Sequence, residues 1–176
     1  MFYADEASVS LSSTSGRTYG PRGKPAILPI NTEVSRRLYV ASAISTEGDL
    51  FYEVREKAFD GQAIVKFLKQ ILGIVVEKVL IIWDNASIHD CERTREFLSN
   101  YEEAKRLQLA KQPTYSPELN ADEQVWSRLK SVGLKNRCYQ NVKELKRKVI
   151  EEMEKMKQER QRIQKYFHHP DLGFYN

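Results

Sequence analysis

The sequence has few cysteines and no long hydrophobic run. Its two cysteines, Cys91 and Cys138, are far apart and form no CxxC pair. This spacing favours free thiols in a reducing cytoplasm over a disulfide framework or a zinc site. The longest apolar stretch, residues 71–83, is interrupted by a glycine and two charged side chains and is too short to span a bilayer. The N-terminus carries no positively charged region that would indicate a signal peptide.

Length and composition favour a single globular domain. The chain has 176 residues, of which 41% are hydrophobic and 30% are charged. These values are ordinary for a globular protein with a substantial core. The sequence contains no internal repeat and no low-complexity linker, so we expect residues 1–176 to form one domain.

The charges are unevenly distributed along the chain. Residues 1–123 contain 15 Lys and Arg against 18 Asp and Glu, whereas residues 124–165 contain 13 against 5. An acidic region suits bound metal ions, and a basic region suits a phosphate backbone. The alternative for the basic region is an ordinary solvated helix face.

Hydrophobic periodicity predicts an α/β fold. Apolar runs predict strands over residues 1–9, 37–45, 50–54, 77–83 and 107–110, with a short edge strand over 26–30. Stripes with helical spacing predict helices over 61–73, 91–101, 119–132 and 141–165. Asp90 and Asn120 are candidate caps for the second and third helices. Three meandering strands followed by alternating helices and strands give a mixed sheet with helices on its faces.

Three acidic residues lie at the ends of predicted elements. Asp5 closes the apolar run 2–4, and Asp84 closes the longer run 79–83. The first and fourth main strands are expected side by side, which places these two acids together, and the later helix brings Glu123 over. Such a set can hold two divalent cations for phosphodiester chemistry, because hard cations prefer oxygen ligands. The alternative is three unrelated surface acids.

The residues around these acids resemble a known family. The matching blocks are Asp-Glu at 5–6, RTYGPRG at 17–23, DNASIH at 84–89 and YSPELNADEQVW at 115–126, with Lys130 beyond them. They resemble the ribonuclease H-like catalytic domain of DDE transposases, above all the bacterial insertion-sequence group related to the mariner elements. The last two blocks are the most specific, and the likeness covers about residues 2–135.

The resemblance implies a fold, an activity and a cofactor. The fold is a five-stranded mixed sheet flanked by helices, with an additional C-terminal helix. Asp5, Asp84 and Glu123 are the catalytic residues and bind two Mg²⁺ or Mn²⁺ ions. Water as the nucleophile gives DNA strand cleavage, and a 3′-hydroxyl gives strand transfer into a target.

Further residues are candidates for DNA contact. By resemblance, the loop that carries Arg17, Arg22 and Lys24 can form a clamp-like projection that meets DNA or a second protomer; the alternative is a solvated hairpin loop. His89 is a candidate to contact the scissile phosphate or orient a carboxylate, against a structural hydrogen bond. Lys130 lies on the helical face of Glu123 and is a candidate phosphate contact.

Two neighbours of these residues have other expected roles. Asn85 is a candidate to support a metal ligand, against a structural role. Trp126 is expected to pack in the core rather than stack on a base.

The chain departs from the family pattern in two places. Ala121-Asp122 stands where the family usually has Pro-Ile, so Asp122 is a possible competitor for metal. Consecutive helical residues point about 100° apart, however, so Asp122 and Glu123 cannot both face one site. Family members also carry helix-turn-helix modules before the first Asp, whereas this chain begins four residues before it. We therefore expect a catalytic fragment, a separately encoded catalytic half or a decayed copy.

The expected partners are DNA, as transposon ends and as target, and a second copy in a homodimer, with no membrane. By resemblance the target is a TA dinucleotide, and a DNA-binding module supplied in trans is a further expected partner. The expected location is cytoplasmic and nucleoid-associated. Two other functions remain open from the sequence. One is a different ribonuclease H-like nuclease, and the other is a catalytically silent, transposon-derived DNA-binding module.

Overall fold

A five-stranded mixed sheet forms the centre of the protein. The computed structural model describes residues 1–12, 19–24, 27, 36–114 and 116–168. The strands are β1 (Phe2–Ser10), β2 (Arg37–Ser45), β3 (Leu50–Arg55), β4 (Val79–Trp83) and β5 (Leu107–Lys111), in the order β3-β2-β1-β4-β5. β1, β2 and β3 are antiparallel neighbours, whereas β1, β4 and β5 run parallel. The predicted mixed sheet is confirmed, with the first and fourth strands paired at its centre.

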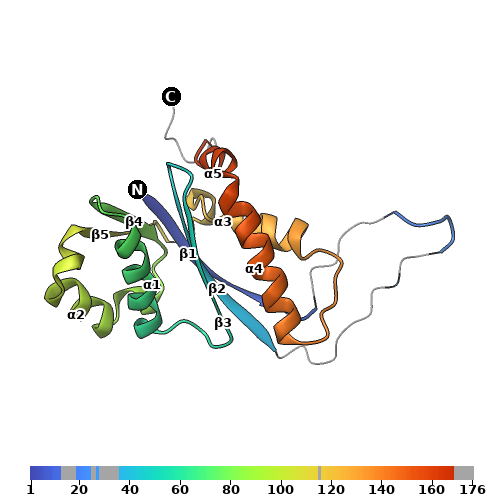
Figure 1. Ribbon diagram of the computed structural model, residues 1–176, viewed down its shortest axis with the longest axis horizontal. Coiled ribbons are helices and arrows are strands. Elements are labelled where there is room, and N and C mark those ends of the chain that lie inside the picture. Colours follow the sequence, from blue (N-terminus) through green and yellow to red (C-terminus); the bar gives the residue numbers. More distant parts are fainter. Residues whose placement is uncertain (13–18, 25–26, 28–35, 115, 169–176) are drawn as a thin grey trace.

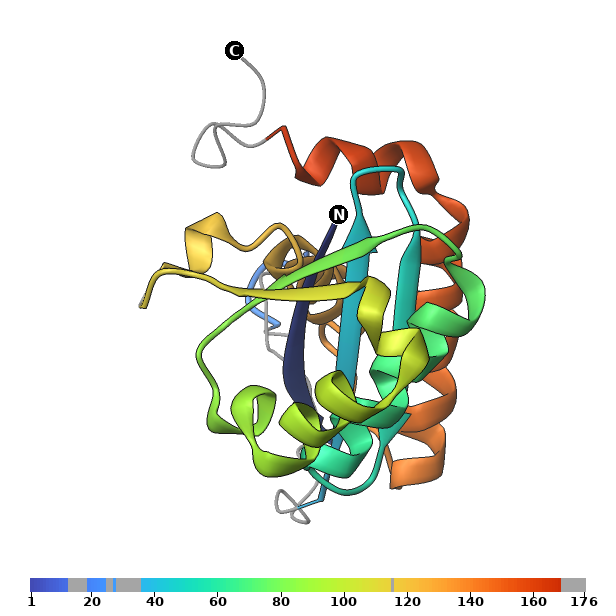
Figure 2. The ribbon, with the colours of Figure 1, turned by 90° about the vertical axis from the view of Figure 1, so that its left-hand side faces the viewer.

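Helices cover both faces of this sheet. One face carries α1 (Gly61–Ile74) and α2 (Glu92–Asn100), and the other carries α3 (Glu123–Arg128), α4 (Val142–Gln158) and α5 (Arg160–Tyr166). In Figure 2, α1 and α2 lie in front of the sheet and α4 lies behind it. Shorter helical turns are η1 (Ser87–Asp90), η2 (Glu102–Arg106), η3 (Pro117–Leu119) and the π-helical η4 (Leu129–Gly133). Among the described residues, no helix combines the length and apolarity needed to cross a bilayer.

Strand alternation divides the core into two layers. Phe2 and Ala4 on β1 pack in the layer under α1, where Phe67 and Ile71 are buried. Tyr3, the residue between them, packs in the opposite layer beneath α3 and α4. Because side chains on a strand point alternately to the two faces, β1 contributes to both cores and its position is fixed from both sides.

The helix boundaries correct several details of the sequence prediction. Cys91, not Asp90, is the N-cap residue of α2, and the Asp90 carboxylate instead accepts from Lys111 Nζ at 2.8 Å. The helix predicted from residue 119 begins at Glu123, because Pro117–Leu119 forms a separate 3₁₀ turn. Asn120 does not cap it; its side chain accepts from the backbone N–H of Asp122 at 3.1 Å in the turn before the helix. The edge strand predicted over 26–30 lies outside the described residues.

The single C-terminal helix predicted over 141–165 is broken at Glu159. The Glu159 carboxylate accepts two hydrogen bonds from Arg128, at 2.9 and 2.5 Å, and so ties the break to the helix bearing Glu123. The hairpin turn between β2 and β3 packs against the same break. Gly48 has a φ of +86°, and a Cβ there would lie 2.5 Å from the Arg160 carbonyl oxygen. Only glycine meets both conditions, so the turn sequence fixes this contact.

Candidate active site

The sheet register brings the predicted acids together. Phe2 pairs with Ile81 and Tyr3 with Ile82 in the parallel β1–β4 ladder. Continuing that register by two residues aligns Asp5 with Asp84, which directly follows β4. Both acids and Glu123, the first residue of α3, line one pocket of about 360 Å³. The other walls of this acid pocket come from the loops that follow β4 and β5.

Asp5 is more buried than Asp84 and is held by two hydrogen bonds. Its Oδ1 accepts from the Glu6 backbone N–H at 2.8 Å, and its Oδ2 accepts from Trp126 Nε1 at 3.0 Å. Burial, together with the negative charges of Glu123 and Glu6, raises the pKa of Asp5 to about 7 in spite of these hydrogen bonds. When the pKa of a carboxyl group is raised in this way, a nearby cation stabilises its charged form. The predicted packing role of Trp126, which is buried, is confirmed.

Asp84 is held differently, at the rim of the pocket. Its side chain is 55% exposed, and its Oδ1 accepts from the Ala86 backbone N–H at 2.9 Å. The Nδ1 atom of His89 hydrogen-bonds to the Asp84 backbone carbonyl at 3.2 Å and lies 3.1 Å from the same carboxylate oxygen. On the other side of the imidazole, Nε2 lies 3.0 Å from a carboxylate oxygen of Glu6. The imidazole therefore links Asp84 to the residue next to Asp5.

His89 is a buried residue in this network. Its ring stacks on Trp83 with centroids 4.0 Å apart, and its side chain is 1% exposed. Burial alone would lower the pKa of His89, but hydrogen bonding and charge from Glu6 and Asp84 outweigh burial and raise it. These contacts favour the carboxylate-orienting role among those expected for His89. A contact with DNA would require the ring to leave this position.

Asp122 points away from the pocket, into the core. Its side chain is fully buried, and its Oδ2 lies 2.6 Å from the Ser42 hydroxyl on β2. Ser42 is itself the register partner of Asp5. Burial, followed by the charges of Asp5 and Glu123, raises the pKa of Asp122 well above its ordinary value and favours the neutral acid. The pair joins the turn before Glu123 to the strand beside Asp5.

The roles of Glu6 and Ser42 were not predicted from the sequence. A signal for Ser42 was present, since it is a polar residue within the apolar middle of its strand. Nothing local in the sequence identifies its partner, which lies 80 residues away.

The remaining candidates lie outside the acid pocket. Arg22 and Lys24 are exposed and Lys130 is half-buried in the π-helical turn η4, and none of the three lines the pocket. Arg17 falls outside the described residues. Asn85 has a structural contact, because its Nδ2 donates to the Gln112 carbonyl at 2.8 Å and joins the loops after β4 and β5. The DNA contacts of the three cations stay predictions.

The donor set of the acid pocket fits hard divalent cations. Among the described residues, no three His, Cys, Asp or Glu side chains surround a single point closely enough to hold one ion. Magnesium, however, is usually bound by one or two carboxylates together with water and substrate phosphate oxygens. Three carboxylates around one pocket therefore suit ions that share ligands and complete their shells with substrate. Asp5, Asp84 and Glu123 are the residues that would hold them.

The mixed sheet, its helical layers and the acid pocket together define a ribonuclease H-like fold with a carboxylate site at its centre. The sequence profile of the DDE superfamily endonucleases matches residues 1–146. The chain therefore belongs to this family. Among curated protein sequences, none matches this chain.

Solved structures of a mariner transposase share the fold. The mariner Mos1 paired-end complex with Mg matches with a TM-score of 0.73 and 16% identity, over 95% of this chain and 51% of that one. The corresponding complex with Mn gives 0.61 and 14%, over 99% and 56%. The Mos1 catalytic domain gives 0.54 and 10%, over 93% and 80%. The chain thus spans about half the length of the Mos1 chains in the paired-end complexes and most of the separate catalytic domain.

Proposed function

We propose that this chain is the catalytic domain of a DNA transposase, which cleaves DNA strands and transfers them to a target. The observation that carries the proposal is the acid pocket. Carboxylates from β1, from the end of β4 and from α3 line one cavity in a chain of the DDE endonuclease family. The fold shared with a mariner transposase supports this function over that of other ribonuclease H-like nucleases.

The chain's own residues orient two of the three carboxylates, those of Asp5 and Asp84. Trp126 and the Glu6 backbone hold both oxygens of Asp5, so this carboxylate presents a fixed edge to the pocket. His89 and the Ala86 N–H direct Asp84, which remains open to solvent and to substrate. Two bound divalent ions would activate the attacking water or 3′-hydroxyl and stabilise the leaving oxygen.

The proposal includes the metal ions, the assembly and the cellular location. Two ions per site, Mg²⁺ or Mn²⁺, match a set of three carboxylates, and the Mos1 complexes named above contain Mg or Mn. The working assembly is a homodimer on transposon-end and target DNA, with sequence-specific recognition supplied by a separate DNA-binding module. The location is cytoplasmic, at the nucleoid.

Nicking of a supercoiled plasmid tests the proposed function. The wild-type chain should nick with Mg²⁺ or Mn²⁺ and not with EDTA, and Asp84→Asn should abolish nicking without loss of fold. Asp90→Asn is the matched control, because Asp90 is a nearby exposed acid that does not line the pocket. Wild-type-like nicking by Asp84→Asn would overturn the site. A folded wild-type chain that never nicks would favour the silent DNA-binding module.

A further inference from the structure

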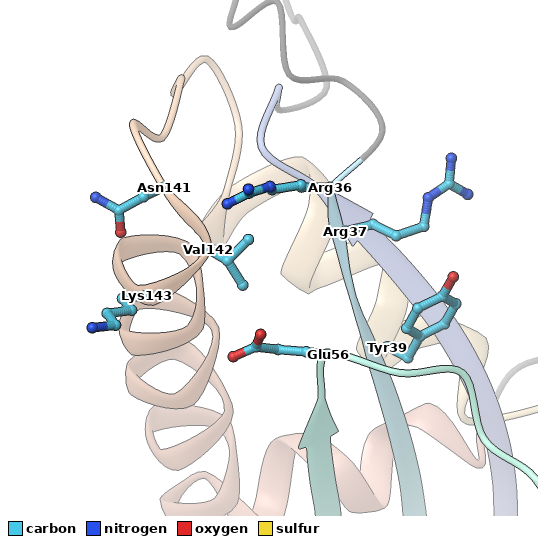
Figure 3. Close-up of a pocket in the computed structure, with 7 residues that line it drawn as sticks. All are labelled: Arg36, Arg37, Tyr39, Glu56, Asn141, Val142 and Lys143. Carbon is cyan, nitrogen blue, oxygen red and sulfur yellow. The ribbon is translucent and has the colours of Figure 1, made fainter.

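A second cavity, of about 670 Å³, lies where β2 begins, β3 ends and α4 begins. Figure 3 shows Arg36 and Glu56 pointing toward α4, whereas Arg37 points to the other side of β2. Lys143, in the first turn of α4, forms the opposite wall. Three of its charged lining residues are cations and one is an acid, so the cavity favours an anionic ligand.

The positive charge of this cavity continues along one face of α4. Lys143, Lys146 and Arg147 are spaced i, i+3 and i+4, so their side chains are neighbours on the helix surface. Within the described part of the chain, none of these three pairs with a carboxylate. Glu144, the acid in this stretch, accepts instead from the Gln140 backbone N–H at 2.9 Å.

Two lysines further along the same helix are ion-paired. Lys155 lies 2.5 Å from Glu151 and 3.1 Å from Glu152, and Lys148 contacts the same two acids. Beyond the break, Arg162 pairs with Glu159 at 2.9 Å. Three cations that have no such pair within the described residues, Lys143, Lys146 and Arg147, therefore lie together at the start of α4, beside the cavity.

The helix end itself offers little to a ligand. The Asn141 side chain caps α4 by accepting from the Glu144 N–H at 3.0 Å. Binding at this place would therefore rest on the cationic side chains. Lysine and arginine on two neighbouring elements suit the repeated charges of a nucleic-acid backbone.

The sheet register gives the distance from this cavity to the acid pocket. Arg37 pairs with Ser10, which lies five residues after Asp5 on β1. At about 3.4 Å per residue, the separation along the strand is roughly 17 Å. Stacked base pairs rise by about 3.4 Å each, so a duplex that lies along the strands would span this separation with roughly five base pairs.

We propose that Arg36, Lys143, Lys146 and Arg147, here called the basic rim, bind the phosphodiester backbone of duplex DNA. The bound phosphates lie roughly five base pairs from the one held at the acid pocket. The inference rests on the proposed function and adds to it a second, sequence-independent contact with the same substrate. Arg22, Lys24 and Lys130 are not part of the basic rim.

Salt-dependent DNA binding tests the basic rim. Anisotropy of a labelled random-sequence duplex is measured in EDTA, which separates binding from cleavage, for wild type and for the Lys143→Gln, Lys146→Gln, Arg147→Gln triple variant. Each lost phosphate contact lowers the slope of log affinity against log salt by about 0.9, so we expect a decrease of about 2 to 3. Affinity near 0.15 M salt should fall at least about tenfold.

A charge-matched control separates the basic rim from net charge. The Lys155→Gln, Arg160→Gln, Arg162→Gln variant also removes three cations, but these are ion-paired, so its slope should stay near that of wild type. Equal losses in both variants, or a rim variant with the wild-type slope, would overturn the proposal. The single Arg147→Gln variant, with an expected slope change of about 1, covers the case in which the triple variant does not fold.

Plasmid nicking keeps this proposal distinct from the proposed function. The rim variant should need more plasmid to reach half-maximal nicking but retain the wild-type maximal rate, whereas Asp84→Asn loses the rate itself. If wild type binds DNA through the basic rim and never nicks, the rim stands and the proposed function fails. A wild-type chain that does not bind duplex at all would overturn the basic rim.

Discussion

Asp5 and Asp84 lie side by side on neighbouring strands, yet their surroundings differ. Asp5 is enclosed by Trp126 and by the turn that Asp122 anchors, and burial raises its pKa to about 7. Asp84 is more than half exposed and is directed by one imidazole and one backbone N–H. Burial thus disfavours a negative charge on Asp5 in the folded chain, whereas the carboxylate of Asp84 is exposed to solvent. Metal binding at the acid pocket should therefore depend on different supporting residues at Asp5 and at Asp84.

The largest expected effect is the loss of nicking when either Asp5 or Asp84 is replaced. Thermal stability should then distinguish the two variants. Asp5→Asn and Asp84→Asn should each reduce metal-dependent nicking by at least about 1,000-fold, because either removes a ligand charge worth several kcal/mol. Without metal at pH 8, Asp5→Asn should melt several degrees above wild type, since it removes a charge that folding disfavours. Asp84→Asn should melt near wild type. Thermal melts in EDTA measure this, and an Asp5→Asn protein that melts below wild type would contradict it.

The pH dependence of stability follows from the same carboxyl. The folded-state pKa of Asp5 is about 7, above its ordinary value of 3.8. Between these two pH values the folded chain keeps a proton that the unfolded chain has lost. The contribution of Asp5 to stability therefore falls as pH rises from about 4 to about 7, by at most about 4 kcal/mol. Urea unfolding measures the free energy of unfolding at each pH across this range. Its decrease per pH unit should be smaller in Asp5→Asn than in wild type.

Metal binding should sharpen the contrast. A cation at the acid pocket must displace the proton of Asp5, so its affinity should rise by about tenfold from pH 6 to pH 8. Titration calorimetry with Mn²⁺ at the two pH values measures this change. An affinity that does not vary with pH would show that Asp5 is already ionised in the metal-free chain.

On the Asp84 side, the supporting residue is His89. Because the imidazole directs Asp84 and is itself held by Glu6, His89→Ala should slow nicking by about 10- to 100-fold and raise the Mg²⁺ concentration required. His89→Asn, which can still donate one hydrogen bond, should recover part of the loss. Equal losses in both variants would indicate that stacking on Trp83, rather than orientation of Asp84, is the important contribution.

The smallest expected effect concerns the Asp122–Ser42 pair on the Asp5 side. Ser42→Ala leaves a buried carboxyl without its partner and should lower the free energy of unfolding by about 1–3 kcal/mol. Asp122→Asn should cost less, because the amide can donate to the Ser42 hydroxyl. The double variant Ser42→Ala, Asp122→Leu should be more stable than Ser42→Ala alone. Urea denaturation of wild type, Ser42→Ala, Asp122→Leu and their double variant measures the coupling between the two positions.

The sequence predicted those parts of the fold that local pattern determines. Alternating apolar residues predicted β2 over Arg37–Ser45 with its observed ends, and the helical stripe predicted α1 to within one residue. The meeting of Asp5, Asp84 and Glu123 followed from strand order. The break at Glu159 did not follow, because the α4 stripe continues through it and the bend depends on Arg128, a residue distant in sequence. The orientation of His89 likewise depends on Glu6, which lies 83 residues away.

The Ser42–Asp122 pair also has a consequence for how this chain diverged. By resemblance, related DDE domains usually have isoleucine where this chain has Asp122, and an apolar side chain there has no use for a hydroxyl at position 42. An acid acquired first, without the serine, would have been buried with neither oxygen bonded. Positions 42 and 122 should therefore vary together among natural sequences of this family.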